Sequence, residues 1–409
     1  MGRKTLWIVF AIVLVDMLGV GILIPIIPLL FSDPSYTYYL GLDSHTGYLL
    51  LGILTALYPI AMFFALPVLG QLSDTFGRKP VLAISLFGTA LSYVLFALGI
   101  IFLHIPLLFI SRALDGLTGG NVAVAQAAIA DTTTSDERIR AFGIIGAANG
   151  IGFILGPLVA GTLSDTHILR WFGAPTPFWF AAGLSTINLL AVVFFFPETL
   201  KTKTKYYLKF LESFRNIREA ATDKLRRTLY ITTFLYQSGF AFIITFFGVF
   251  LVSVFKFDQS QIGYLFAFVG AGLVFAQAAI TTPLSRRFRQ ETVIAGSLFL
   301  VGGAVCGIYF ITSVFWLYVL TGLGAVSIGV VFTNLPALIS TVSKDKLQGS
   351  VLGINSSVQA LAQAIPPIFA GVIAALLAPT TPVLFAAGSI FAAFLYFTAH
   401  HWKKILTAK

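Results

Sequence analysis

The chain has 409 residues, of which 57% are hydrophobic and only 10% are charged, and its mean hydropathy is +0.92. Soluble domains carry about 25% charged residues, so this composition excludes an ordinary soluble protein. The formal net charge of +10 would suit a nucleic-acid-binding protein, but the distribution of the charges argues against that class. Cys306 is the only cysteine and lies in an apolar run, so disulfide bonds are not expected.

Apolar stretches long enough to cross a membrane predict an all-α membrane protein with twelve spans. The predicted spans are 7–31, 46–70, 81–103, 106–131, 139–163, 176–197, 227–255, 261–284, 292–313, 314–342, 349–378 and 382–402. The Lys and Arg residues fall at the termini and in the even-to-odd turns, except for Arg112, Arg170 and Lys256. This bias predicts that both termini are cytoplasmic, and it explains the net charge without a nucleic-acid partner.

The first predicted span contains an acidic residue, Asp16, roughly 13 Å from its start at 1.5 Å per residue. A charged carboxylate at that depth is costly unless it is paired or hydrated. Because burial disfavours the charged form of a carboxyl, Asp16 is a candidate for carrying a proton or binding a substrate cation. The alternative is a structural hydrogen bond between helices.

The turn between the second and third spans has the pattern G-x-L-x-D-x-x-G-R-K-P. Its flexible backbone comes from Gly70 and Gly77, and Arg78 and Lys79 are expected to hold it on the cytoplasmic side. Asp74 is free to meet the positive N-terminal end of another helix. The alternative is an ordinary basic loop with no switching role.

The fourth predicted span contains two opposite charges, Arg112 and Asp115, before a cluster of glycines. Their i, i+3 spacing puts them on one helix face, where they are expected to pair. Buried opposite charges make sense mainly around a wet cavity, although a purely structural pair is the alternative. Because Arg112 would keep Asp115 ionised, Asp16 is the better candidate proton carrier.

The fifth predicted span has a stripe of small residues, with Gly152, Gly156, Pro157 and Gly161 after a single amide, Asn149. Glycines let membrane helices approach closely, and the proline bends the helix. Small residues are common in membrane helices, so this stripe by itself does not define a function.

The middle of the chain is basic, and its apolar residues Tyr207, Phe210, Leu211, Phe214 and Ile217 recur at helical spacing. This pattern favours an amphipathic helix on the inner leaflet, with a flexible linker as the alternative. The predicted divisions are 1–197, 198–226 and 227–409. Three small or kinking residues recur at one fixed offset, Gly143, Pro157 and Gly161 matching Gly353, Pro367 and Gly371, which predicts a duplicated six-helix unit.

The second half offers amides in place of charges. They are Gln237, Gln277, Asn334, Asn355, Gln359 and Gln363. The last three repeat every four residues and form one stripe on the eleventh span. With Asp16, Arg112 and Asn149, the six amides are the candidate lining of a substrate cavity; packing between spans is the alternative.

These patterns together resemble the major facilitator superfamily, and most of all its drug:proton antiporter branch of tetracycline-efflux-like and multidrug transporters. The turn with Arg78 is similar to motif A, Arg112 and its glycines to motif B, and the fifth span to motif C, the antiporter motif, with Ala160 in place of one glycine. The resemblance implies two pseudo-symmetric six-helix bundles, a monomer and alternating access. It also implies that Asp131 bonds Arg78 and that the motif A turn acts as a conformational switch.

Two positions depart from the tetracycline exporters, which carry aspartates where this chain aligns Ser92 and Leu300. Tetracycline is therefore a doubtful substrate. The resemblance predicts proton-coupled efflux of small amphiphilic compounds across the inner (plasma) membrane, with protons, substrate and lipid as partners and no cofactor.

Three other functions are alternatives to efflux. The first is transport of a metabolite or siderophore, in which Asp16 only binds the substrate. A membrane enzyme is disfavoured, because the sequence shows no metal-ligand cluster, no Ser-His-Asp set and no phosphate-binding loop. A receptor or scaffold would not need buried charge in two related halves.

Overall fold

The computed structural model describes residues 3–132, 135–200, 212–223, 226–342 and 348–406, and the regular structure of these ranges is helical. The chain divides into two compact units. Unit 1 comprises Met1–Gly41, Leu57–Glu212 and Gln259–Ala267, and unit 2 comprises Leu42–Ala56, Ser213–Asp258 and Phe268–Lys409. Helices α2 and α10 contribute to both units, and the predicted divisions at 197 and 227 stay a prediction.

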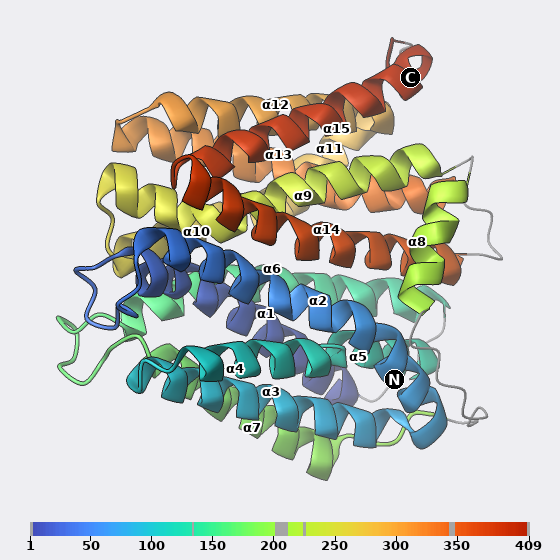
Figure 1. Ribbon diagram of the computed structural model, residues 1–409. Coiled ribbons are helices and arrows are strands. Elements are labelled where there is room, and N and C mark those ends of the chain that lie inside the picture. The colour runs from blue at the N-terminus through green and yellow to red at the C-terminus, as the bar shows by residue number, and fades with distance from the viewer. Residues whose placement is uncertain (1–2, 133–134, 201–211, 224–225, 343–347, 407–409) are drawn as a thin grey trace. The chain divides into compact units, whose positions relative to one another are not determined.

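Unit 1 is built from the helices of the first half. They are α1 (Arg3–Ser32), most of α2 (Ser44–Phe76), α3 (Arg78–Ile101), α4 (Ile105–Thr118), α5 (Asn121–Thr132), α6 (Ser135–Leu163), α7 (Thr176–Phe195) and the start of α10 (Gln259–Phe275). In Figure 1, α4 and α5 follow one another along one line. Helix α1 packs along α6, and α3 packs against α4 and α7. A buried apolar cluster that includes Val9, Leu82 and Ile129 joins α1, α3, α5, α6 and α7.

Unit 2 contains the remaining helices. They are the start of α2, α8 (Glu212–Thr222), α9 (Arg227–Phe250) with the π-turn η1 (Leu251–Phe255), the end of α10 with the π-turn η2 (Ala276–Ile280), α11 (Thr281–Arg287), α12 (Gln290–Phe310), α13 (Val314–Thr341), α14 (Gln348–Leu376) and α15 (Thr381–Leu406). Helix α15 packs against α9 and α12, and α14 packs against α9.

The predicted number of spans is not confirmed as twelve. Within the described residues, eleven helices are long and apolar enough to cross a membrane. The predicted span 106–131 is instead divided into α4 and α5, of 14 and 12 residues, each shorter than the roughly 20 residues that a span needs. The break between α4 and α5 falls at Gly119 and Gly120. Glycine is a poor helix former, so two glycines in a row favour a break there.

The internal repeat is visible as two matching helix crossings. In unit 1, a Cβ added to Gly263 of α10 would lie 2.5 Å from the carbonyl oxygen of Pro157 and 3.1 Å from Cα of Gly161. In unit 2, a Cβ added to Gly52 of α2 would collide with the carbonyl oxygen of Pro367 and lie 3.0 Å from Cα of Gly371. Glycine therefore allows the same close backbone approach at equivalent places in each half.

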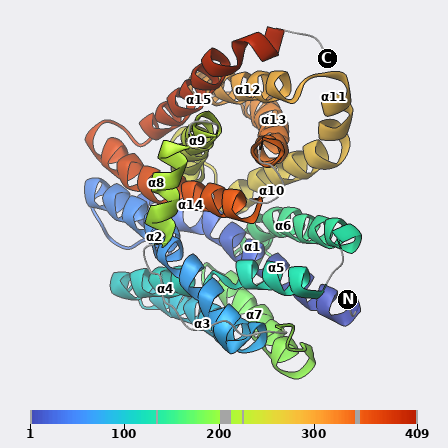
Figure 2. The same cartoon turned by 90° about the vertical axis from the view of Figure 1, so that its right-hand side faces the viewer.

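The predicted amphipathic segment is helical where it is described. Figures 1 and 2 show α8 crossing the end of α14, to which Asn216 is joined by a 3.0 Å hydrogen bond from Nδ2 to Oγ of Ser357. Phe214 of α8 is half exposed. Tyr207, Phe210 and Leu211 lie outside the described residues, and binding of α8 to the leaflet stays a prediction.

Candidate functional site

Unit 1 contains a buried polar cluster formed by Asp16, Tyr58, Tyr93, Arg112, Asp115 and Asn121. Asp16 of α1 is 7% exposed, and its Oδ1 accepts a 2.9 Å hydrogen bond from Nδ2 of Asn121, which is fully buried. Asn121 is the first residue of α5, directly after the break that divides the fourth span. The helix break thus brings a neutral amide to the carboxylate of the first span.

The two opposite charges of α4 pair with each other, although Nε of Arg112 is buried without a hydrogen-bond partner among the described residues. Nη1 of Arg112 donates to Oδ2 of Asp115 at 2.8 Å, as their spacing predicted, and both side chains are buried. The Arg112 guanidinium also lies 4.7 Å from the ring centroid of Tyr58, a cation–π contact. The hydroxyl of Tyr93 packs directly on Gly19 of α1, where any side chain would collide with it.

The small residues of α6 hold that helix close to α1 on either side of Asp16. A Cβ on Gly152 would lie 2.7 Å from the carbonyl oxygen of Leu14, and a Cβ on Gly156 would lie 2.6 Å from that of Leu18. The sequence predicted such close packing from the glycines alone. The motif C stripe therefore fixes the backbone that carries Asp16.

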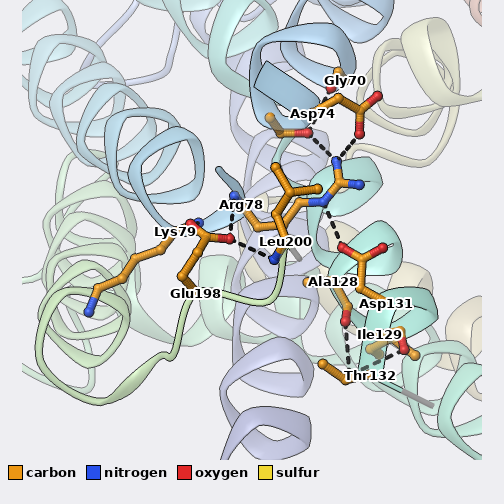
Figure 3. Close-up of polar contacts among 11 residues, drawn as sticks. Gly70, Asp74, Arg78, Lys79, Ala128, Ile129, Asp131, Thr132, Glu198 and Leu200 are labelled. Atoms are coloured by element: carbon orange, nitrogen blue, oxygen red, sulfur yellow. Dashed lines mark hydrogen bonds and ion pairs between the residues drawn. The ribbon is translucent and has the colours of Figure 1, made fainter. Parts of the chain in front are cut away.

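The turn between α2 and α3 forms a second polar group, which we call the turn network: Ser73, Asp74, Arg78, Asp131 and Glu198. Figure 3 shows Arg78 at its centre. Its Nη1 contacts Oδ1 of Asp74 at 2.7 Å and Oγ of Ser73 at 2.6 Å, and its Nε donates to Oδ2 of Asp131 at 2.9 Å. The contact between Arg78 and Asp131 that the family resemblance implied is present. The contact of Asp74 with another helix stays a prediction.

The side chain of Glu198 binds backbone N–H groups at the start of α3. Its two carboxylate oxygens accept hydrogen bonds from the N–H groups of Arg78 at 2.9 Å and Lys79 at 3.2 Å (Figure 3). Burial raises the pKa of the Glu198 carboxyl, but these donors and that of Leu200 outweigh it, so its pKa lies below the ordinary value. Gly77 precedes them with φ +119°, and a Cβ there would collide with Glu198.

The amides of the second half do not share one environment. Both polar atoms of the Asn334 side chain are hydrogen-bonded within the protein. Its Oδ1 accepts from Oγ of Ser285 at 3.0 Å, and its Nδ2 donates to the carbonyl of Val330 at 3.0 Å. Gln237 and Asn355 are buried on α9 and α14, and within the described part of the chain Oε1 of Gln237 and Oδ1 of Asn355 have no partner.

The other predicted cavity residues are more exposed. Asn149 and Gln359 are half-buried, whereas Gln363 and Gln277 are exposed, the latter in the π-turn η2. The stripe on α14 therefore runs from a buried end at Asn355 to an exposed end at Gln363. A lining role for these four residues stays a prediction.

Sequence reasoning missed two functional candidates, Asn121 and Glu198. Asn121 follows two glycines, a pattern that suggests a helix break and so a side chain free of the helix ladder. Glu198 is an acid at the end of a span, just before a strongly basic segment. Neither signal names the partner, which in each case lies more than 100 residues away in the sequence.

The long apolar helices of this fold are those of a membrane protein. The chain matches the Major Facilitator Superfamily model over residues 9–367 and 229–405, and it belongs to that family. It is therefore a multi-pass membrane transporter whose substrates are small molecules.

Similar proteins include drug-efflux transporters. The tetracycline resistance protein, class H, of Pasteurella multocida is 30% identical over 414 residues, covering 100% of this chain and 98% of that protein. Multidrug resistance protein 2 of Bacillus subtilis is 27% identical and covers 91% of this chain and 89% of its own length.

Solved structures show the same fold. The human organic anion transporter MFSD10 has a TM-score of 0.72 at 24% identity, covering 97% of this chain and 99% of that one. The nucleoside transporter NupG has a TM-score of 0.75 at 15% identity, with the same coverage of both chains.

Proposed function

We propose that this transporter exports small amphiphilic molecules across the inner (plasma) membrane in exchange for protons, by alternating access. The similarity to tetracycline and multidrug resistance proteins supports export. The concentration of Lys and Arg at the termini and in alternate turns supports a cytoplasmic location for both termini. We propose that it works as a monomer in lipid, without nucleic acid or a cofactor.

The environment of Asp16 carries the proposal of proton coupling. The carboxylate is buried, and its hydrogen-bond partner is a neutral amide, because Arg112 is occupied by Asp115. A buried carboxylate without a cation in direct contact gains most from taking up a proton. Asp115, in contrast, is neutralised by the guanidinium beside it. Asp16 is thus the proton carrier, and Arg112 and Asp115 set the field around it.

Polar atoms of unit 2 support a substrate that donates hydrogen bonds. Oε1 of Gln237, Oη of Tyr236 and Oδ1 of Asn355 are buried without a partner among the described residues. The rings of Tyr236 and Phe240 both meet Phe332 edge-on, at 5.6 and 5.4 Å between centroids. Amide and hydroxyl acceptors beside aromatic rings suit a planar, partly polar molecule.

The substrate is proposed to differ from tetracycline. This chain has Ser92 and Leu300 where the tetracycline exporters carry aspartates. Ser92 is buried and its hydroxyl donates a hydrogen bond to the carbonyl oxygen of Thr89, whereas Leu300 is 44% exposed. A specific metabolite or siderophore is the second candidate, favoured by these two departures. The turn network is proposed as the conformational switch of the cycle, since its central arginine joins α2, α3 and α5.

The proposal is tested with purified protein in proteoliposomes and an imposed pH gradient. Ethidium, a planar aromatic cation, and tetracycline are the probes. We expect ethidium flux to follow the gradient and to stop when a protonophore collapses it, and tetracycline flux to be at least tenfold lower. Asp16→Asn is expected to abolish the gradient dependence, whereas Asp165→Asn, at an exposed turn, leaves it unchanged. Ethidium flux that ignores the gradient in the wild type would reject proton coupling.

A further inference from the structure

The short helix α5 touches both polar groups of unit 1. Its first residue, Asn121, donates to Asp16, and its penultimate residue, Asp131, accepts from Arg78. The two residues are ten positions apart, which is roughly 15 Å along the helix at 1.5 Å per residue. Gly119 and Gly120 separate α5 from α4, so the two are not one continuous helix.

The joint itself is tightly packed against α2. A Cβ on Gly119 would lie 2.9 Å from Oη of Tyr58, and one on Gly120 would lie 2.5 Å from Cδ1 of Leu69. Glycines are therefore required for α2 to approach the start of α5. Asn121 follows this joint directly and donates to Asp16 of α1.

Only one of the two polar atoms of the Asn121 amide has a hydrogen-bond partner among the described residues. Nδ2 donates to Asp16, but Oδ1 is buried and has no partner within the described residues. An ionised carboxylate only accepts hydrogen bonds, so the amide must present its nitrogen; the reverse orientation would set two acceptors face to face. A protonated carboxyl has one O–H to donate, and then the amide oxygen becomes the better partner.

We propose that Asn121 reads the protonation state of Asp16 and that α5 passes this state to the turn network. With Asp16 charged, Nδ2–H of Asn121 binds it. When a proton from solution binds the carboxylate, the amide turns over and Oδ1 accepts the new O–H, while Asn121 itself neither gains nor loses a proton. This inference rests on the proposed proton coupling and makes Asn121 a positioning residue.

The other groups around Asp16 cannot take this part. Asp115 of α4 repels the negative charge of Asp16, and Arg112 is paired with Asp115. Tyr58 of α2 and Tyr93 of α3 also interact electrostatically with Asp16, but among the described residues the hydrogen bond to its carboxyl comes from Asn121 and not from their hydroxyls. Helix α6 presents Gly152 and Gly156 to α1. The amide of Asn121 is the group in direct contact that can exchange donor for acceptor.

The simpler reading is that Asn121 only joins two helices. The chain offers a matched control for it, because Asn188 of α7 is also buried and its Nδ2 donates at 3.0 Å to the same helix, at the carbonyl of Ala11. That acceptor does not titrate. Replacing Asn188 therefore removes a comparable bond to α1 without touching the carboxyl.

The test is a pH titration of the purified full-length protein by infrared difference spectroscopy. The band to follow is the carboxylic C=O stretch that Asp16→Asn removes. Asn121→Leu is expected to move its midpoint toward alkaline pH by roughly one to two units, because a charged acceptor loses its donor. Asn188→Leu is expected to leave the midpoint in place. If Asn121→Leu does not fold, Asn121→Asp keeps the shape and is expected to shift the midpoint in the same direction.

The transmission through α5 is tested in the same titration. Coupling between two sites is reciprocal, so a turn network that responds to Asp16 must also change its proton affinity. In this structure Arg78 is bonded to Asp131 while Asp16 accepts from Asn121, which is the arrangement proposed for charged Asp16. Asp131→Asn is therefore expected to raise the proton affinity of Asp16 several-fold. Asp165→Asn is the control and is expected to have no effect.

The possible outcomes separate the proposals. An unchanged midpoint in both Asn121 variants would make the amide a structural bond only and overturn the inference, while leaving proton coupling intact. An unchanged midpoint in Asp131→Asn alone would remove α5 as the link. If no carboxyl band depends on Asp16, both the inference and the proposed proton coupling are wrong.

Discussion

The turns before α3 and before α12 occupy equivalent places in the two halves but are held by different chemistry. In unit 1, Ser73 accepts from the buried guanidinium of Arg78, which also binds two carboxylates. In unit 2, the matching Ser285 donates to the amide oxygen of Asn334. Ionic contacts respond to pH and to movement of either partner, whereas the neutral pair does not titrate. Among the described residues, ionic contacts hold the turn before α3 and a neutral pair holds Ser285, so the proposed switch is assigned to unit 1.

The largest difference between the two halves is expected when Arg78 of unit 1 and Arg286 of unit 2 are each replaced. Arg78→Ala removes the buried cation that the carboxylates of Asp74 and Asp131 both contact, and it is expected to cost about 3 kcal/mol of unfolding free energy and most of the transport rate. Arg286→Ala, at the exposed end of α11 in unit 2, is expected to change stability by less than about 0.5 kcal/mol. Thermal unfolding in detergent and ethidium flux measure both. Equal losses in the two variants would contradict the comparison.

The backbone of the two turns gives the next difference. Gly77 has φ +119° and ψ 156°, a region that is almost confined to glycine, and Glu198 occupies the space of a side chain. Gly77→Ala is expected to destabilise the protein by about 2 kcal/mol. The matching residue before α12 is Arg289, with φ −63° and ψ 145°, so Arg289→Ala is the control and is expected to be nearly neutral. A tolerated Gly77→Ala would show that the strained turn is not required.

The matched serines give a smaller difference. Ser73→Ala removes a buried acceptor of a charged donor and is expected to cost about 1.5 kcal/mol, while Ser285→Ala removes a bond between neutral groups and is expected to cost about 0.5 kcal/mol. The unfolding free energies of the two variants, measured side by side, check this order. The reverse order would place the stronger contact in unit 2.

The smallest effect is expected at Glu198, and it depends on pH. Because backbone donors hold the pKa of this carboxyl below its ordinary value of 4.5, its stabilising contribution is complete above that pH and is lost as the pH falls below it. Glu198→Gln is therefore expected to lower the unfolding free energy by about 1 kcal/mol at neutral pH and by almost nothing in acid. The expected loss is this small because the Glu198 carboxyl is partly exposed to solvent. Helix α12 carries its own acid, Glu291, in its first turn, so Glu291→Gln serves as the counterpart. A cost for Glu198→Gln that stays constant with pH would contradict the assigned hydrogen bonds.

Much of this molecule could be predicted from local pattern. Long apolar runs locate the helices because each span must satisfy its backbone hydrogen bonds within itself. The i, i+3 spacing of Arg112 and Asp115 predicted their pairing for a similarly local reason, and the glycines of the fifth span predicted its close packing on a neighbour. The family resemblance added the contact between Arg78 and Asp131, which spacing alone does not contain.

The sequence by itself therefore determined the class, the helices and the charged residues of unit 1. Only the tertiary structure decided the break in the fourth span, the bond of Asn121 to Asp16, the binding of Glu198 to the start of α3 and the engagement of Asn334 by Ser285. The physical reason is distance along the chain. Periodicity and hydropathy act over one helix, whereas these contacts depend on which helix faces meet after packing, and a buried polar group takes whichever partner that packing supplies.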